Sequence, residues 1–422
     1  MLDRTVAPAA ATISSPKIQQ PETHFFSNGQ PVYLINAGYQ PVVKLEIIVQ
    51  SGIWNEPKPG LSWITAKTLS EGSSKKSANE ITGLFEFYGS FIEINPGFDN
   101  TSIVLHTPKK YFKDSVKLLA EILFSPSFPE KEIDIIKTNK IEQLKINNEK
   151  TNFIASRKTR EAIFGLDHPY GKSLSEDEIE LLSRDDIQKY FHSNFYNNPE
   201  FFLSGLIDST ELEVLSSSFD LAINQNTRNS NIENKLVGTN DIFIEKSTSI
   251  QSSIRLAWQI PHKGHHDHYK IMILNEILGG YFSSRLMKNL REDKGYTYGV
   301  HSYPIFLQEA SFFLISADVI AESAKDAIDE IHKEIDILKN DLVNDDELET
   351  VRNYMAGTFL SSVSTPFQLM EKFKTIHSHG LNYGYFDNFF TSLKNITAEE
   401  ILQTANSYLR IEDLHTVVVG KK

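Results

Sequence analysis

The sequence contains no cysteine, which excludes disulfide bonds, thiol nucleophiles and thiolate metal sites. Any metal ion would have to be held by histidines and carboxylates. Basic residues are also few beside acidic ones, because 42 Lys and Arg stand against 55 Asp and Glu and give a formal net charge of −13. Nucleic-acid binding needs a clustered basic surface, so we expect no nucleic-acid partner.

Long apolar runs are missing as well. No stretch approaches the roughly 18 consecutive apolar residues of a membrane-spanning helix, and the first residues lack the apolar run of a secretory signal. We therefore expect a cytoplasmic protein with no membrane span. The sequence also has no Gly-x-Ser-x-Gly, Walker A or Gly-x-Gly-x-x-Gly motif, which leaves serine-nucleophile and nucleotide-binding functions without support.

The length and composition indicate a globular protein with two domains. A chain of 422 residues is too long for one ordinary core and fits two domains of roughly 200 residues each. Hydrophobic residues make up 40% and charged residues 23% of the chain, as in globular proteins rather than disordered or membrane proteins. Two repeated halves are therefore the first pattern to test.

The same order of predicted elements occurs twice along the chain. In the first half, alternating and β-branched residues over 31–49 predict two strands that form a hairpin around a glycine-containing turn. The other elements predicted there are helices at 60–72, 77–88, 110–123 and most of 130–164, and strands at 90–95 and 102–106. In the second half we predict strands at 252–259, 296–300 and 311–317, and helices at 269–278, 283–292 and 321–338.

The repeat predicts the fold class and the domain boundaries. Gly89 and Gly295 occupy matching places in the two series, as in a distant internal duplication. Because hairpins take the place of βαβ crossovers, we predict an α+β fold of two homologous domains, each a mostly antiparallel sheet covered by helices. The predicted segments are an N-terminal arm (1–27), a first domain (28–215), a polar linker (216–240) and a second domain (241–422).

One segment of the second half carries a family resemblance. It reads Ser283-Ser-Arg-Leu-Met-Lys-Asn-Leu-Arg-Glu-Asp-Lys-Gly-Tyr-Thr-Tyr298, preceded by Leu274-Asn-Glu-Ile-Leu-Gly-Gly280, and the first half carries His168-Pro-Tyr-Gly171. These segments resemble the pitrilysin/insulinase family of zinc peptidases, which includes mitochondrial processing peptidase and its inactive relatives. The resemblance covers roughly residues 28–420.

The resemblance implies a substrate-binding role for Arg291 and Tyr298. In the family, an Arg and a Tyr at these two places contact the substrate backbone and polarise the scissile carbonyl. A guanidinium and a phenol are both donors that can be aimed at carbonyl oxygens. Without the resemblance, Arg291 would be read as a surface ion-pair partner and Tyr298 as a strand residue of an amphipathic sheet.

The resemblance also implies that the metal site has been lost. Active members carry His-x-x-Glu-His on a first-half helix, where two histidines hold zinc and the glutamate acts as general base. The matching positions here are Trp63, Ala66 and Lys67, and the third ligand falls at or near Gln143, with Glu142 as the nearby carboxylate. None of the three helix positions can do this chemistry, so we expect no metal on this chain.

A second place to look for metal ligands is the histidine-rich stretch His262-Lys-Gly-His-His-Asp-His268. His262 and His266 have a spacing that could hold a metal on a helix. Pro261 and Gly264, however, indicate a loop. We therefore interpret these residues as solvated loop histidines.

The combination of a lost metal site and a retained Arg/Tyr segment predicts the function. Some peptidases of the family are divided between a subunit with His-x-x-Glu-His and a subunit with the Arg/Tyr pair. We expect this chain to be of the second kind, a non-catalytic subunit that binds a peptide or small unfolded protein, with zinc on its catalytic partner. The alternatives are a scaffold or assembly protein and a stand-alone peptide-binding homodimer.

Overall fold

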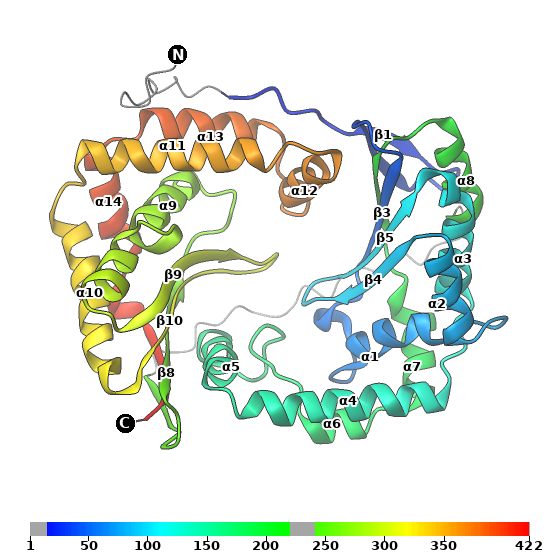
Figure 1. Ribbon diagram of the computed structural model, residues 1–422, viewed down its shortest axis with the longest axis horizontal. Coiled ribbons are helices and arrows are strands. Elements are labelled where there is room, and N and C mark those ends of the chain that lie inside the picture. The colour runs from blue at the N-terminus through cyan, green and yellow to red at the C-terminus, as the bar shows by residue number, and fades with distance from the viewer. Residues whose placement is uncertain (1–14, 220–240, 422) are drawn as a thin grey trace, which may run out of the picture.

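The computed structural model describes residues 15–219 and 241–421. The chain forms two halves, blue to green and green to red in Figure 1, each with a sheet whose outer face is covered by helices. No helix among the described residues is long and apolar enough to cross a membrane. The predicted α+β fold with two domains is confirmed.

The first half contains a six-stranded sheet in the order β1-β2-β6-β3-β5-β4. Its strands are β1 (Glu22–Phe25), β2 (Pro31–Asn36), β3 (Val42–Val49), β4 (Phe91–Pro96), β5 (Thr101–Pro108) and β6 (Glu200–Gly205). The prediction of two strands within 31–49 is confirmed, but the prediction that they form a hairpin is wrong. The last strand of this half, β6, lies between them, parallel to β2 and antiparallel to β3. Five of the six residues of β6 are buried, which fits a central position in the sheet.

The second half repeats this arrangement in a five-stranded sheet of order β7-β11-β8-β10-β9. The strands are β7 (Ile242–Glu245), β8 (Gln251–Gln259), β9 (Thr297–Phe306), β10 (Ser311–Ile320) and β11 (His415–Gly420). The last strand, β11, lies between β7 and β8, parallel to β7 and antiparallel to β8, just as β6 lies between β2 and β3 in the first half. Gly89 and Gly295, which precede β4 and β9, both have left-handed backbone angles, with φ of 62° and 66°. The structure thus supports the inferred duplication.

The helices also follow each other in a repeated series. Those of the first half are α1 (Leu61–Thr68), α2 (Ala78–Phe87), α3 (Phe112–Phe124), α4 (Glu130–Asn148), α5 (Thr151–Phe164), α6 (Glu176–Glu180), α7 (Arg184–Tyr190) and α8 (Ser209–Phe219). Those of the second half are α9 (His268–Asn275), α10 (Ala324–Asn340), α11 (Asp345–Ser361), α12 (Pro366–His377), α13 (Gly384–Asn395) and α14 (Ala398–Tyr408). Three π-helices are η4 (Phe191–Phe195), η5 (Glu276–Gly280) and η6 (Met287–Asp293). The helix predicted at 283–292 is therefore largely the π-helix η6.

Each half contributes one helix to the sheet of the other half. Helix α5 packs on β8 and β11, where buried Ile154 and Ala155 lie in one apolar cluster with Val417. Helix α12 packs in return on β2 and β6, where buried Met370 joins Phe202. Figure 1 shows α5 beside β8 at one side of the molecule and α12 beside the first sheet at the other. A third apolar cluster also joins the halves, because Phe164 at the end of α5 packs with Ala257 and Phe312 of the second sheet.

One predicted boundary, between residues 215 and 216, falls inside α8. Residues 1–14 of the predicted arm and 220–240 of the predicted linker lie outside the described residues. Residues 216–219 belong to α8, and Phe219 is buried against the first core. Within the arm, β1 pairs with β2, and Ser15 donates a hydrogen bond to Asp387 on α13 of the second half.

Candidate functional site

Arg291 and Tyr298 lie close in sequence on two packed elements of the second half. Arg291 is on η6, and its guanidinium carbon stands 4.7 Å from the ring centre of Phe282. Tyr298 is on β9, the edge strand of the second sheet, and its side chain is 90% exposed. Arg291 forms no ion pair with any residue in 15–219 or 241–421. Both donors are therefore open to an added ligand.

Buried contacts hold η6 in place beneath Arg291. Leu290 and Met287 are almost fully buried in the second core. Asn289 donates hydrogen bonds to Glu330 and Glu334 on α10, at 2.8 and 2.7 Å. These contacts fix the helix on one side and leave Arg291 on the other, which is the arrangement expected of a preorganised donor.

The turn after η6 fixes the start of β9 and so the place of Tyr298. Tyr296 donates its N–H to the carbonyl of Leu290 at 2.8 Å, and the hydroxyl of Thr297 donates to the carbonyl of Asp318 at 2.7 Å. Gly295 lies between the two elements with φ of 66°, a conformation that costs a residue with a side chain about 1 kcal/mol or more. The sequence Lys-Gly-Tyr-Thr-Tyr thus supplies the turn as well as the exposed phenol.

The three positions expected to match the zinc-binding motif lie on α1. Ala66 is fully buried, Trp63 is half-buried, and Lys67 is exposed and donates its ammonium proton to the carbonyl of Ile94 at 2.8 Å. The start of α1 is held by the carboxyl of Glu56, which accepts N–H groups from the first turn at 3.0 Å. Burial raises the pKa of Glu56 to about 7. Helix α1 is thus well anchored but offers no metal ligand at these three positions.

The structure brings Lys140, rather than Gln143, against the altered motif. The ammonium nitrogen of Lys140 on α4 lies 5.2 Å from the ring centre of Trp63. Gln143 is exposed and accepts a hydrogen bond from Lys140 at 3.4 Å, while Glu142 is exposed and pairs with Lys145. The place expected to match the family's metal site therefore carries two cations, Lys67 and Lys140.

Two more basic residues near this place were not identified as site residues from the sequence. Arg157 and Arg160 lie on α5 and line the same cavity as Trp63 and Lys140. Their spacing of three places them on one face of a helix, which is the only signal that the sequence offered. Basic residues on amphipathic helices are usually solvated, so this signal was too weak to single them out.

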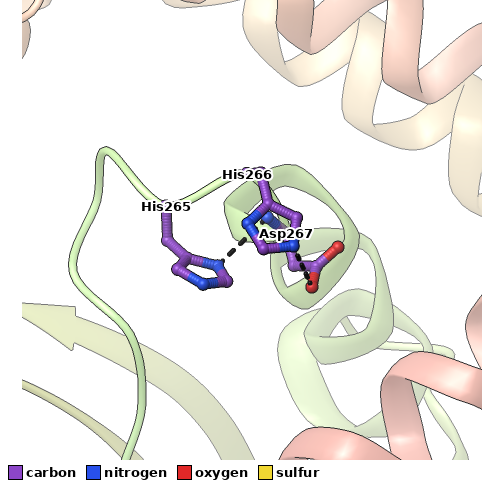
Figure 2. A group of neighbouring side chains, drawn as sticks. All are labelled: His265, His266 and Asp267. Atoms are coloured by element: carbon purple, nitrogen blue, oxygen red, sulfur yellow. Dashed lines mark hydrogen bonds and ion pairs between the residues drawn. The ribbon is translucent and has the colours of Figure 1, made fainter.

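The histidine-rich stretch forms the turn that leads into α9 (Figure 2). Ligand atoms of His265, His266 and Asp267 lie within 4.8 Å of one another, and this is the only such group among the described residues. Asp267 already accepts a hydrogen bond from Tyr408 at 2.7 Å and lies 3.2 Å from the ring nitrogen of His266. Its own N–H donates to Nδ1 of His265 at 3.2 Å. His262, whose spacing from His266 could suit a metal on a helix, is not part of this group.

The sequence also matches two models of one peptidase family. The insulinase model, peptidase family M16, matches residues 31–177, and the peptidase M16 inactive-domain model matches residues 182–355. The chain belongs to the pitrilysin/insulinase family. It is an inactive-type member, and the positions expected to match His-x-x-Glu-His, Trp63, Ala66 and Lys67, offer neither an imidazole nor a carboxylate.

Similar proteins cover nearly the whole chain. An uncharacterised zinc protease, YmxG, of Bacillus subtilis is 23% identical over 82% of this chain and 85% of its own length. A Helicobacter pylori protein named non-peptidase homolog YmxG is 21% identical over 86% of this chain and 85% of its own length. The solved peptidase M16 inactive domain of Pseudomonas fluorescens superposes with a TM-score of 0.85, at 24% identity, over 95% of this chain and 98% of its own. That likeness establishes the shared fold.

Proposed function

We propose that this chain is the non-catalytic, substrate-binding subunit of a heteromeric zinc metallopeptidase that acts on peptides or small unfolded proteins. The zinc would be held by a catalytic partner with His-x-x-Glu-His. This chain would contribute Arg291 and Tyr298 as donors to carbonyl groups of the substrate in the partner's active site.

The observation that carries the proposal is the difference between the two halves. The first half has Trp63, Ala66 and Lys67 where a zinc site would be, whereas the second half keeps Arg291 and an exposed Tyr298 on a well-anchored π-helix and an edge strand. Tyr298 is 90% exposed and Arg291 has no ion-pair partner among residues 15–219 and 241–421, so both donors are available to a substrate carbonyl.

The second candidate is a protein without a peptidase role, either a scaffold or a peptide-binding homodimer. One observation favours it, namely that the similar Helicobacter pylori protein is called a non-peptidase homologue. The two candidates differ in whether Arg291 and Tyr298 matter for hydrolysis, so they can be separated by experiment.

The test measures peptide hydrolysis by the purified chain, alone and mixed with a His-x-x-Glu-His homologue from the same genome, in zinc buffer. Activity is expected only in the mixture. Arg291→Ala or Tyr298→Phe should lower kcat/KM of the mixture by about 100-fold, the cost of one lost transition-state donor. Arg410→Ala and Tyr39→Phe, at exposed positions elsewhere, serve as controls. A mixture that stays fully active with both Arg291 and Tyr298 changed supports the second candidate.

A further inference from the structure

A cavity of about 290 Å³ lies beside the altered zinc motif, between α1, α4, α5 and the turn that joins β4 to β5. Four cationic side chains line it: Lys140, Arg157, Arg160 and Lys172. None of the described residues that line it is acidic. In a chain with a net charge of −13, such a concentration of positive charge calls for a physical reason.

Three of these cations have only neutral partners. Lys140 donates to the amide oxygen of Gln143, Arg157 to that of Asn148 at 3.2 Å, and Arg160 to the carbonyl of Ser156 at 3.5 Å. None of the three forms an ion pair with a residue in the described parts of the chain. Lys172 differs, because it lies 3.9 Å from the carboxylate of Glu178.

Arg160 carries a hydrogen-bond donor in this cavity that has no acceptor in the described part of the chain. Its Nε atom is buried and has no hydrogen-bond partner among the described residues. A buried donor without a partner costs about 1–3 kcal/mol, and more when it carries charge. A ligand that accepts this hydrogen bond would recover that cost on binding.

The cations also repel one another at a site that is partly buried from solvent. Burial, and then the neighbouring charge of Lys67, lower the pKa of Lys140. Burial, and then Arg157, lower the pKa of Arg160. Both shifts go in the direction that a bound anion would reverse.

Three aromatic rings are part of the same cavity lining. Trp63 lies under Lys140, and Phe98 lies 5.6 Å from the guanidinium carbon of Arg160. Phe153 also lines the cavity. Apolar walls with cations among them suit an anionic group attached to an apolar body.

We propose that this cavity binds a carboxylate of a peptide, either an acidic side chain or the C-terminal carboxylate, held by Lys140, Arg157 and Arg160. The volume fits a single side chain or terminal residue and is below that of most pockets for drug-sized ligands. Guanidinium groups bind carboxylates in a fork geometry, which favours Arg157 and Arg160 as the direct contacts. The assignment of a peptide as the source of the carboxylate rests on the proposed function.

The test measures peptide binding by the full chain alone, with fluorescence anisotropy of labelled peptides of one length. The first peptide is neutral and amidated, the second has a free C-terminal carboxylate, the third has one internal Glu and an amidated end, and the fourth has phosphoserine in place of that Glu. At least one carboxylate peptide should bind 10-fold more tightly than the neutral peptide, and the second and third distinguish the two sources. Equal affinity of the neutral and both carboxylate peptides overturns the proposal, as does phosphoserine being the only anion that binds.

Single substitutions locate the binding to the cavity. Lys140→Gln and Arg157→Gln should each lower the preference for the carboxylate peptide to within about twofold of the neutral peptide. Lys145→Gln removes an exposed charge on the same helix as Lys140 and should leave the preference unchanged. Loss of preference in Lys145→Gln to the same extent would attribute it to net charge and refute the site.

The readout separates this proposal from the proposed function. Binding of the carboxylate peptide by the chain alone, with no hydrolysis in the mixed assay, keeps the anion site and removes the peptidase-subunit role. Hydrolysis in the mixture that depends on Arg291, with no carboxylate preference in the binding assay, gives the opposite result.

Discussion

The ammonium nitrogen of Lys374 on α12 lies 2.5 Å from the carboxylate of Glu46 on β3, so an ion pair joins the two halves of the chain. Lys44 lies 2.9 Å from the same carboxylate. The Glu46 side chain is only 6% exposed, whereas that of Glu371, which pairs with both lysines, is 51% exposed. The buried carboxylate is therefore the centre of the cluster.

This cluster predicts an acid-sensitive contribution to stability. Burial alone would raise the pKa of Glu46, but Lys374 and Lys44 outweigh it and hold the pKa below its usual value of 4.5. A carboxyl with a lowered pKa in the folded state stabilises the fold above its unfolded pKa and loses this contribution as the pH falls through the folded value. Glu46→Gln should lower the free energy of unfolding by about 3 kcal/mol at pH 7.

Urea unfolding at pH 7 and at successively lower pH below 4.5 checks this prediction. The difference between Glu46→Gln and the unchanged protein should shrink as the pH falls. Glu371→Gln, which removes the exposed acid of the same cluster, should cost at most about 1 kcal/mol. A difference for Glu46→Gln that is the same at every pH would show that the charge on this carboxyl does not contribute.

A second contact of α12, which is apolar, predicts a pH-independent effect of similar size. Met370 on α12 is 1% exposed and packs with Ile35 and Phe202 of the first sheet. Met370→Ala should cost about 2–5 kcal/mol through lost burial and the cavity left behind. Thr375→Ala, at an exposed position on the same helix, should change stability by at most about 0.5 kcal/mol. Urea unfolding that does not distinguish the two variants would mean that α12 does not depend on this contact.

Local sequence patterns predicted most elements but not how they pair. Period and turn residues are short-range signals, so the strands within 31–49 and the helices flanking them were found. The insertion of β6 between β2 and β3 depends on a contact across more than half of the first domain, and no local pattern encodes it. The same holds for the exchange of α5 and α12 between the halves.

The candidate site likewise has one part that a local motif identifies and one part that only the packing of helices brings together. Arg291 and Tyr298 lie in one continuous segment, so a motif was enough to single them out. Lys140 comes from α4 and Arg160 from α5, and only the packing of these helices beside Trp63 brings them to one cavity. Gln143 was the expected position on α4, and the residue that faces the motif is one helical turn earlier.

The turn of His265, His266 and Asp267 predicts no dependence of stability on metal. A metal ion would have to displace the hydrogen bond from Tyr408 to Asp267 and the one from Asp267 N–H to His265. An ion that bound only the folded state would raise Tm. We expect the same Tm after dialysis against EDTA as after addition of zinc. A rise in Tm with zinc that disappears in His265→Ala would contradict this expectation.

The duplicated glycines predict a matched pair of destabilising substitutions. Gly89 and Gly295 have left-handed φ angles, and a side-chain carbon at either would meet nothing closer than 3.7 Å. Gly89→Ala and Gly295→Ala should therefore each cost about 1–2 kcal/mol from backbone strain alone. Gly357 lies in α11 with equally open surroundings but helical geometry, so Gly357→Ala should stabilise the protein by about 0.5–1 kcal/mol. Thermal unfolding of the three variants compares them directly. If Gly295→Ala behaved like Gly357→Ala, the turn that places Tyr298 would not need its left-handed residue.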